Sequence, residues 1–267
     1  MDVDGAVQAI EAALDGEDFE QALCLASEAV REFPTDLDVQ VLYGQALWAL
    51  GDLQDAREAY REATRLAPET AGIWADVACL HFELAEFEQA REAAERSIAL
   101  EESAETLDLM CKLAEREGCL KEADAFARRA QALDPENFPL PLRVGEADFQ
   151  SLVRDALDGI PPKFREALEG DVAILVEPVP PEQVLKLESP PLDPELLGLY
   201  VGTPLPERED STAQVRLPDR IYLFQRNLEH DVETPEDLVE QIGITLFHEV
   251  GHYLGFTDEE LEERDFG

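Results

Sequence analysis

The sequence predicts a fold of class α + (α+β): an all-α solenoid of helical repeats, then a small α+β domain with its longest helix near the C-terminus. Three observations support this fold class. Small residues recur every 34 positions in the first half, helical periodicity stops at a proline-rich segment, and two short apolar runs precede a long helix in the second half. We therefore expect a solenoid over residues 1–137, a linker over 138–145 and an α+β domain over 146–267.

The first half repeats itself. Ala22, Ala56 and Ala90 are spaced by 34 residues, and Phe19, Leu53 and Phe87 keep the same spacing. A fourth copy, around Ala123, returns with one residue deleted. The four units span about 3–36, 37–70, 71–103 and 104–137. The second unit carries the fullest pattern: Leu42-Tyr43-Gly44, Leu47, Gly51, Leu53, Ala56, Tyr60, Ala63 and Pro68.

This pattern resembles the tetratricopeptide repeat, in which two antiparallel helices meet at small residues. Gly51-Asp52 is expected to break the chain between the helices of the second unit, and Pro68 to end its second helix. The resemblance implies a right-handed solenoid with a concave groove that holds a peptide or a protein partner. The alternative is an array that only supports the second domain or mediates self-association. His81 replaces an expected aromatic residue, and we expect it to pack.

The composition excludes several classes of partner. Sixty-one acidic residues against 21 basic ones give a net charge of −40, which repels nucleic acid and anionic membranes. The sequence contains no apolar run of membrane-spanning length and no basic start typical of a secretory signal. The four cysteines form no C-x-x-C pair, which is typical of free thiols. We expect a cytoplasmic protein that binds neither nucleic acid nor membrane.

The second half predicts mixed elements. Two adjacent prolines, Pro161-Pro162, are expected to end its first helix. The expected elements are helices at 146–157 and 163–169, a strand at 172–176, an irregular loop at 178–194, a turn after 196–200, a strand at 221–224 and a helix from 235 to about 254.

The last helix carries the motif His248-Glu249-Val250-Gly251-His252. On an α-helix, His248 and His252 differ by one turn plus about 40°, so both imidazoles reach one metal ion. Glu249 is next to His248, where it can act on a water at that metal. Gly255 suits a left-handed helix end, and Asp258 follows His252 by six residues.

The pattern H-E-x-x-H-x-x-G-x-x-D resembles the zincin metallopeptidases, with metzincin spacing and Asp in place of the third His. A complete metzincin is excluded, because the only methionines, Met1 and Met110, lie upstream of the motif and provide no Met-turn. A distant Glu ligand, as in gluzincins, lacks room. Residues 146–262 resemble the small bacterial zincin-like metallopeptidases. Further segments carry this resemblance: 161–165, 197–205 and 218–221.

The spacing and the resemblance together predict a Zn²⁺ ion on His248, His252 and Asp258, with Glu249 as general base. Other candidates for the third ligand are His230 and the acidic neighbours Glu259, Glu260, Glu262 and Glu263. Candidates for stabilising an oxyanion are Tyr200, Arg208, Arg220 and Tyr222, and Tyr253 is expected to pack. We also expect the strand at 221–224 to offer an edge to an extended substrate.

The sequence is consistent with two alternative functions. The first is a zinc metallopeptidase that hydrolyses peptide bonds with a metal-activated water, its protein substrate or a regulator being recruited by the repeats. The alternative is a non-catalytic interaction scaffold whose zincin-like domain only binds a metal or a partner. An intact Glu249 favours the enzyme, because a site that only binds metal does not need that carboxylate.

Overall fold

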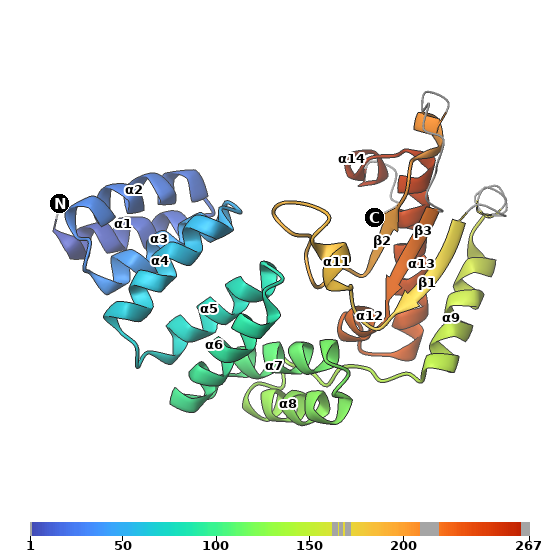
Figure 1. Ribbon diagram of the computed structural model, residues 1–267, viewed down its shortest axis with the longest axis horizontal. Coiled ribbons are helices and arrows are strands. Elements are labelled where there is room, and N and C mark those ends of the chain that lie inside the picture. The colour runs from blue at the N-terminus through green and yellow to red at the C-terminus, as the bar shows by residue number, and fades with distance from the viewer. Residues whose placement is uncertain (1, 162–164, 166–167, 169–171, 209–218, 263–267) are drawn as a thin grey trace. The chain divides into compact units, whose positions relative to one another are not determined.

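The structure is a computed structural model that describes residues 2–161, 165, 168, 172–208 and 219–262 (Figure 1). The chain divides into two compact units. The first contains residues 1–138 with 185–192, and the second contains residues 139–184 with 193–267. Among the described helices, none combines the length and the apolar character needed to cross a bilayer.

The first unit is built of helix pairs, and each predicted repeat contains one pair. The helices are α1 (Val3–Asp15) and α2 (Phe19–Glu32), α3 (Leu37–Ala49) and α4 (Leu53–Leu66), α5 (Ala71–Glu83) and α6 (Phe87–Leu100), and α7 (Ala104–Arg116) and α8 (Leu120–Leu133). Figure 1 shows them in sequence from blue to green.

Small residues and polar caps explain these pairs. The equivalent residues Ala22, Ala56, Ala90 and Ala123 are fully buried where helices meet. Gly44 of α3 lies so close to α4 that a Cβ there would be 3.0 Å from the Tyr60 ring. Asp2, Asp18 and Asp36 accept hydrogen bonds from the first-turn N–H groups of α1, α2 and α3. Gly51, with φ of +78°, makes the turn between α3 and α4.

From Glu146 onward the chain alternates helices and short strands. The elements are α9 (Glu146–Gly159), β1 (Val172–Glu177), α11 (Glu182–Leu185), β2 (Gly198–Val201), the 3₁₀ helix η1 (Leu205–Arg208), β3 (Asp219–Phe224), α12 (Gln225–His230), α13 (Pro235–Leu254) and α14 (Asp258–Glu262).

A three-stranded sheet organises the second unit. Its order is β1-β3-β2, with β1 parallel and β2 antiparallel to β3. In this register Ile174 and Tyr200 lie on either side of Ile221, on one face of the sheet. That face packs against α9 and α13 through a core that includes Phe149, Val153, Ile221, Leu223, Ile242 and Leu246. The all-α array and the small α+β unit confirm the predicted fold class.

Three details differ from the sequence prediction. The strand predicted at 221–224 is not an edge, because β3 is paired on both sides, so the prediction that it offers a free edge to substrate is wrong. The sequence predicts no strand at 196–200, only a turn after it, whereas residues Gly198–Val201 form β2, whose short glycine-containing sequence carries little strand signal. The predicted irregular loop at 178–194 contains α11. The helix predicted at 163–169 lies outside the described residues apart from Arg165 and Leu168.

Candidate metal centre

Helix α13 has a defined start and end. Thr234 caps its N-terminus by accepting a 3.2 Å hydrogen bond from the N–H of Asp237, and Pro235 occupies the first turn. At the other end Gly255 adopts φ of +92°, the left-handed conformation predicted for it. A Cβ at Gly255 would also lie 2.7 Å from Pro206 of η1, so both backbone and packing require glycine. The predicted span of this helix is confirmed.

Three ligand atoms converge at the end of α13. The Nε2 atoms of His248 and His252 are 3.0 Å apart. Asp258 Oδ1 lies 3.1 Å from the first and 3.2 Å from the second. The imidazoles are half-buried, while the Asp258 side chain is 74% exposed. Among the described residues, these three form one group whose ligand atoms all lie within 4.8 Å of one another.

The turn after Gly255 brings Asp258 to this position. The N–H of Phe256 donates to Gly251 O at 3.0 Å, which folds the chain back over the end of α13. Thr257 then caps α14, whose first residue is Asp258. The Glu260 carboxylate accepts the Thr257 N–H at 3.1 Å, and the Glu260 N–H donates to Thr257 Oγ1 at 3.3 Å. This capping box engages the Glu260 carboxylate, whereas Asp258 Oδ1 faces the two imidazoles.

A second contact orients His252. Its Nδ1 lies 3.1 Å from Phe256 O, a backbone carbonyl that can only accept. The proton therefore belongs on Nδ1, which leaves the Nε2 lone pair of His252 directed at the cluster. Metal-binding imidazoles are commonly oriented by such a contact.

The donor set fits a zinc ion. Zn–N and Zn–O bonds of about 2.0–2.1 Å in a tetrahedron place ligand atoms about 3.3 Å apart. The three observed separations are 3.0, 3.1 and 3.2 Å. Two imidazole nitrogens and one carboxylate oxygen are ligands that Zn²⁺ takes in catalytic sites, where a fourth position stays open.

Glu249 lies beside the cluster but points inward. Only 7% of the Glu249 surface is exposed to solvent. Its Oε2 accepts a 2.6 Å hydrogen bond from the backbone N–H of Tyr200 in β2. Burial raises the pKa of Glu249 to about 7, the Tyr200 hydrogen bond opposes this shift, and the negative charge of Asp258 adds to it. A carboxyl group with this pKa exchanges protons near neutral pH.

Comparisons with known proteins agree with both parts of the chain. A family model described as a zincin-like metallopeptidase matches residues 170–267, and a tetratricopeptide repeat model matches residues 7–71. The chain is a tetratricopeptide repeat array joined to a zincin-like domain. No curated protein matches its sequence.

Several solved structures are similar to part of the chain. A thermophilic tetratricopeptide repeat protein from Thermus thermophilus is 22% identical, with a TM-score of 0.47 over 52% of this chain and 78% of that protein. The pilF protein of Pseudomonas aeruginosa is 17% identical, with a TM-score of 0.45 over 51% of this chain and 62% of that protein.

The other predicted residues of the zincin-like domain lie in different places. The Tyr200 hydroxyl donates to Asp219 Oδ1 at 2.7 Å. Arg220 and Tyr222 contact each other at 3.3 Å, and strand alternation puts both on the sheet face opposite α13. Neither side chain is therefore directed toward the histidines. Arg208 is the last residue of η1. His230 is the last residue of α12 and is not part of the group formed by His248, His252 and Asp258. Tyr253 is buried, as expected.

One contact of the site could not be predicted from the sequence, the hydrogen bond from the Tyr200 N–H to Glu249 Oε2. The donor is a backbone N–H group, which does not depend on the type of side chain, so the residue type does not reveal it. The only available signal was the pair of glycines, Gly198 and Gly202, around a tyrosine in a short apolar run, which indicates close approach of another element.

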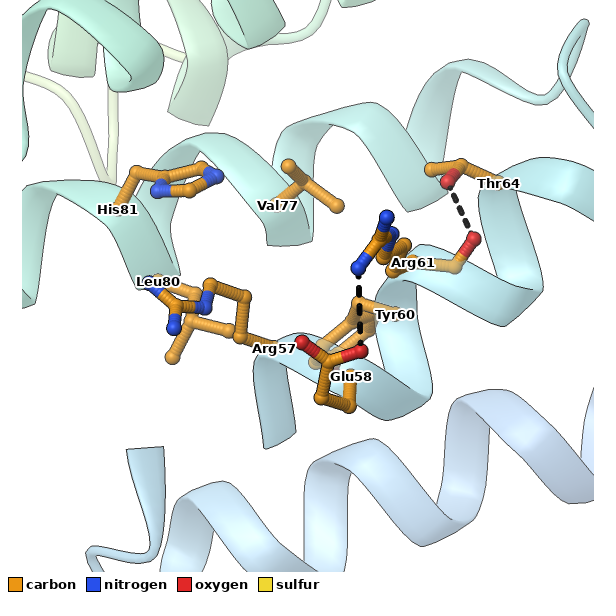
Figure 2. A pocket seen from close by; sticks show the side chains of 8 residues that line it. All are labelled: Arg57, Glu58, Tyr60, Arg61, Thr64, Val77, Leu80 and His81. Carbon is orange, nitrogen blue, oxygen red and sulfur yellow. Dashed lines mark hydrogen bonds and ion pairs between the residues drawn. The ribbon is translucent and has the colours of Figure 1, made fainter. Parts of the chain in front are cut away.

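The repeat array holds a pocket of about 390 Å³ between α4 and α5 (Figure 2). Arg57, Arg61 and His81 line it. Arg57 Nη1 lies 3.0 Å from Glu86 Oε1, and His81 Nδ1 lies 2.6 Å from Glu86 Oε2. His81 is thus a half-buried, hydrogen-bonded residue of the array. Arg61 is 77% exposed, and its Nη1 lies 3.4 Å from Glu58 Oε2. Figure 2 shows this ion pair as a dashed line.

Proposed function

We propose that the zincin-like domain is a zinc-dependent peptidase. His248, His252 and Asp258 would hold the ion, and Glu249 would act as general base. The observation that carries this proposal is the convergence of three ligand atoms, 3.0–3.2 Å apart. The buried carboxyl group of Glu249 lies on the same helix as the two histidines. The family match to zincin-like metallopeptidases supports the same chemistry.

When bound, zinc supplies Lewis acidity, which lowers the pKa of water and polarises a substrate carbonyl. The chain supplies the proton transfers. Glu249 has one carboxylate oxygen, Oε2, held by the Tyr200 N–H, and its other oxygen remains for a water proton. That oxygen takes the proton as water attacks the peptide carbonyl and then gives it to the leaving amine.

The rival function is a scaffold whose zincin-like domain binds metal without hydrolysis. Glu249→Gln separates the two, because it keeps the ligands and removes only the base. We expect this variant to retain zinc and to lose at least ~100-fold in hydrolysis of a mixed peptide library. Cleavage by Glu249→Gln at the wild-type rate, or a zinc-loaded wild type that cleaves nothing, would contradict the peptidase.

We also propose that the repeat array recruits the protein substrate or a regulator. The support is the repeat family itself and the pocket between α4 and α5, where Arg61 presents an exposed guanidinium group on a chain of net charge −40. The expected ligand is an acidic segment of the partner.

Arg61→Glu tests this recruitment, with Arg31→Glu on the exposed side of α2 as the matched control. We expect Arg61→Glu to raise KM for an unfolded acidic protein and to leave KM for a short peptide unchanged. Equal KM values for Arg61→Glu, Arg31→Glu and the wild type with the protein substrate would contradict recruitment at this pocket.

A further inference from the structure

Strand β2 lies directly on the active-site helix at Glu249. A Cβ added to Gly198 would be 2.6 Å from Thr245 Cγ2 and 3.1 Å from Glu249 Cγ. Two residues later, the Tyr200 N–H donates to Glu249 Oε2 at 2.6 Å. Only a glycine at position 198 therefore lets the strand approach α13 closely enough for the bond at Tyr200.

Tyr200 is fixed from three directions. Its strand pairs with β3, with Tyr200 opposite Ile221. Its ring contacts the Tyr253 ring edge-on, with centroids 5.8 Å apart. Its hydroxyl donates to Asp219 Oδ1 at 2.7 Å, and the same oxygen accepts the Thr203 N–H at 3.1 Å. These contacts leave the Tyr200 N–H little freedom to move away from α13.

The hydrogen bond from Tyr200 compensates for the burial of the Glu249 carboxylate. A carboxylate that is 7% exposed costs free energy unless its oxygens find donors. Among the described residues, the Tyr200 N–H is the donor that the structure gives to Glu249 Oε2. With Oε2 engaged, the side chain is held in one orientation and Oε1 remains for the reaction.

We propose that Tyr200 is a positioning residue, whose backbone N–H, held in place by Gly198 and by the Asp219 contacts, fixes the Glu249 carboxylate for proton transfer. This inference rests on the proposed peptidase function. It assigns the Tyr200 hydroxyl to anchoring the strand, in place of the oxyanion contact that the sequence suggested.

The hydrogen bond itself is tested by NMR, without an activity assay, in the metal-free full chain labelled with ¹⁵N-tyrosine. The chain has five tyrosines, and Tyr200→Phe identifies the Tyr200 amide resonance by its loss. A short hydrogen bond to a carboxylate shifts an amide proton downfield. We expect Glu249→Gln to move the Tyr200 resonance upfield by more than any other tyrosine amide. An unmoved Tyr200 resonance would overturn the inference.

The positioning role is tested with Gly198→Ala, and Gly243→Ala is the control, because a Cβ at Gly243 meets no atom within 4 Å. We expect Gly198→Ala to move the Tyr200 resonance, to lower kcat at least ~10-fold and to leave KM and zinc affinity near their wild-type values. We expect Gly243→Ala to change none of these quantities.

A second pair of variants covers a failure of Gly198→Ala to fold. Asp219→Ala removes the acceptor of the Tyr200 hydroxyl and the Thr203 N–H, whereas Asp219→Asn keeps an oxygen there. We expect kcat to fall in Asp219→Ala and to be largely restored in Asp219→Asn. An active wild type whose kcat is unchanged in both Gly198→Ala and Asp219→Ala would overturn the positioning role alone. A zinc-loaded wild type without activity would instead overturn the proposed function.

Discussion

Each unit of this chain contains an acidic residue whose pKa is raised by burial, and only one of them has the surroundings of a catalytic group. In the repeat array, burial raises the pKa of Asp76 to about 6. In the zincin-like domain, burial raises the pKa of Glu249 to about 7. Asp76 has no cluster of ligand atoms beside it among the described residues, whereas Glu249 follows directly on His248. A raised pKa shows that a carboxyl group is buried. Whether the group is a candidate for catalysis depends on the metal-ligating or reactive groups beside it.

The two units also use glycine differently. Gly44 lets two repeat helices approach, and a side chain added there would meet the Tyr60 ring. Gly198 lets β2 approach α13 closely, and its neighbours there are Thr245 and Glu249. The first close contact affects only packing, while the second lies against the proposed general base. Variants in the two units are therefore expected to separate stability from zinc binding and catalysis.

The largest expected effect is loss of zinc from the zincin-like domain. We expect about one zinc per chain in protein purified without chelators, and we expect His248→Ala or His252→Ala to weaken zinc binding at least ~100-fold, since even outer contacts of a metal site are worth ~10–100-fold. Competition with a chromophoric chelator measures the affinity. Folded wild-type protein that takes up no zinc would contradict the site.

The next effect concerns the third ligand. Asp258→Ala is expected to weaken zinc at least ~10-fold, less than a histidine variant because this side chain is 74% exposed. Glu259→Ala is the matched control, and Glu260→Ala is expected to leave the affinity nearly unchanged although it removes a capping contact. If Asp258→Ala binds zinc as tightly as the wild type, the third ligand lies elsewhere.

In the repeat array, Gly44→Ala is expected to lower the free energy of unfolding by about 1–3 kcal/mol, because its Cβ would press on the buried Tyr60 ring at 3.0 Å. Gly72→Ala, whose Cβ meets nothing within 4 Å, is expected to raise it by up to about 1 kcal/mol. Denaturant unfolding measures both variants. Zinc affinity should stay constant in each, and equal stabilities would contradict the close packing at Gly44.

The last expected effect is a pH dependence of stability at Asp76. Its pKa in the folded chain, about 6, exceeds the ordinary value of 3.8, so folding favours the protonated form. The wild type therefore loses stability through this group as pH rises from about 4 to 6, by up to about 1–3 kcal/mol. Asp76→Asn stays neutral, so its melting temperature relative to the wild type should rise over that interval and then level off. A difference that is the same at pH 4 and pH 7 would contradict the shift.

The sequence by itself determined the features that depend on neighbours along the chain. Helical pairs follow from a 34-residue period of small residues, and the ends of α13 follow from Pro235 and Gly255. The facing positions of His248 and His252 follow from helix geometry alone. The ligand roles of His248, His252 and Asp258 and the base role of Glu249 remain predictions until zinc and activity are measured.

Only the tertiary structure decided which strands are neighbours. The sequence identified the apolar run of β3, but pairing with both β1 and β2 makes it central, and that pairing joins segments distant in the chain. The same pairing turns Arg220 and Tyr222 away from α13 and brings the Tyr200 N–H to Glu249. Sheet order and backbone hydrogen bonds depend on long-range contacts and carry almost no residue-type signal, whereas helix periodicity and helix ends are local.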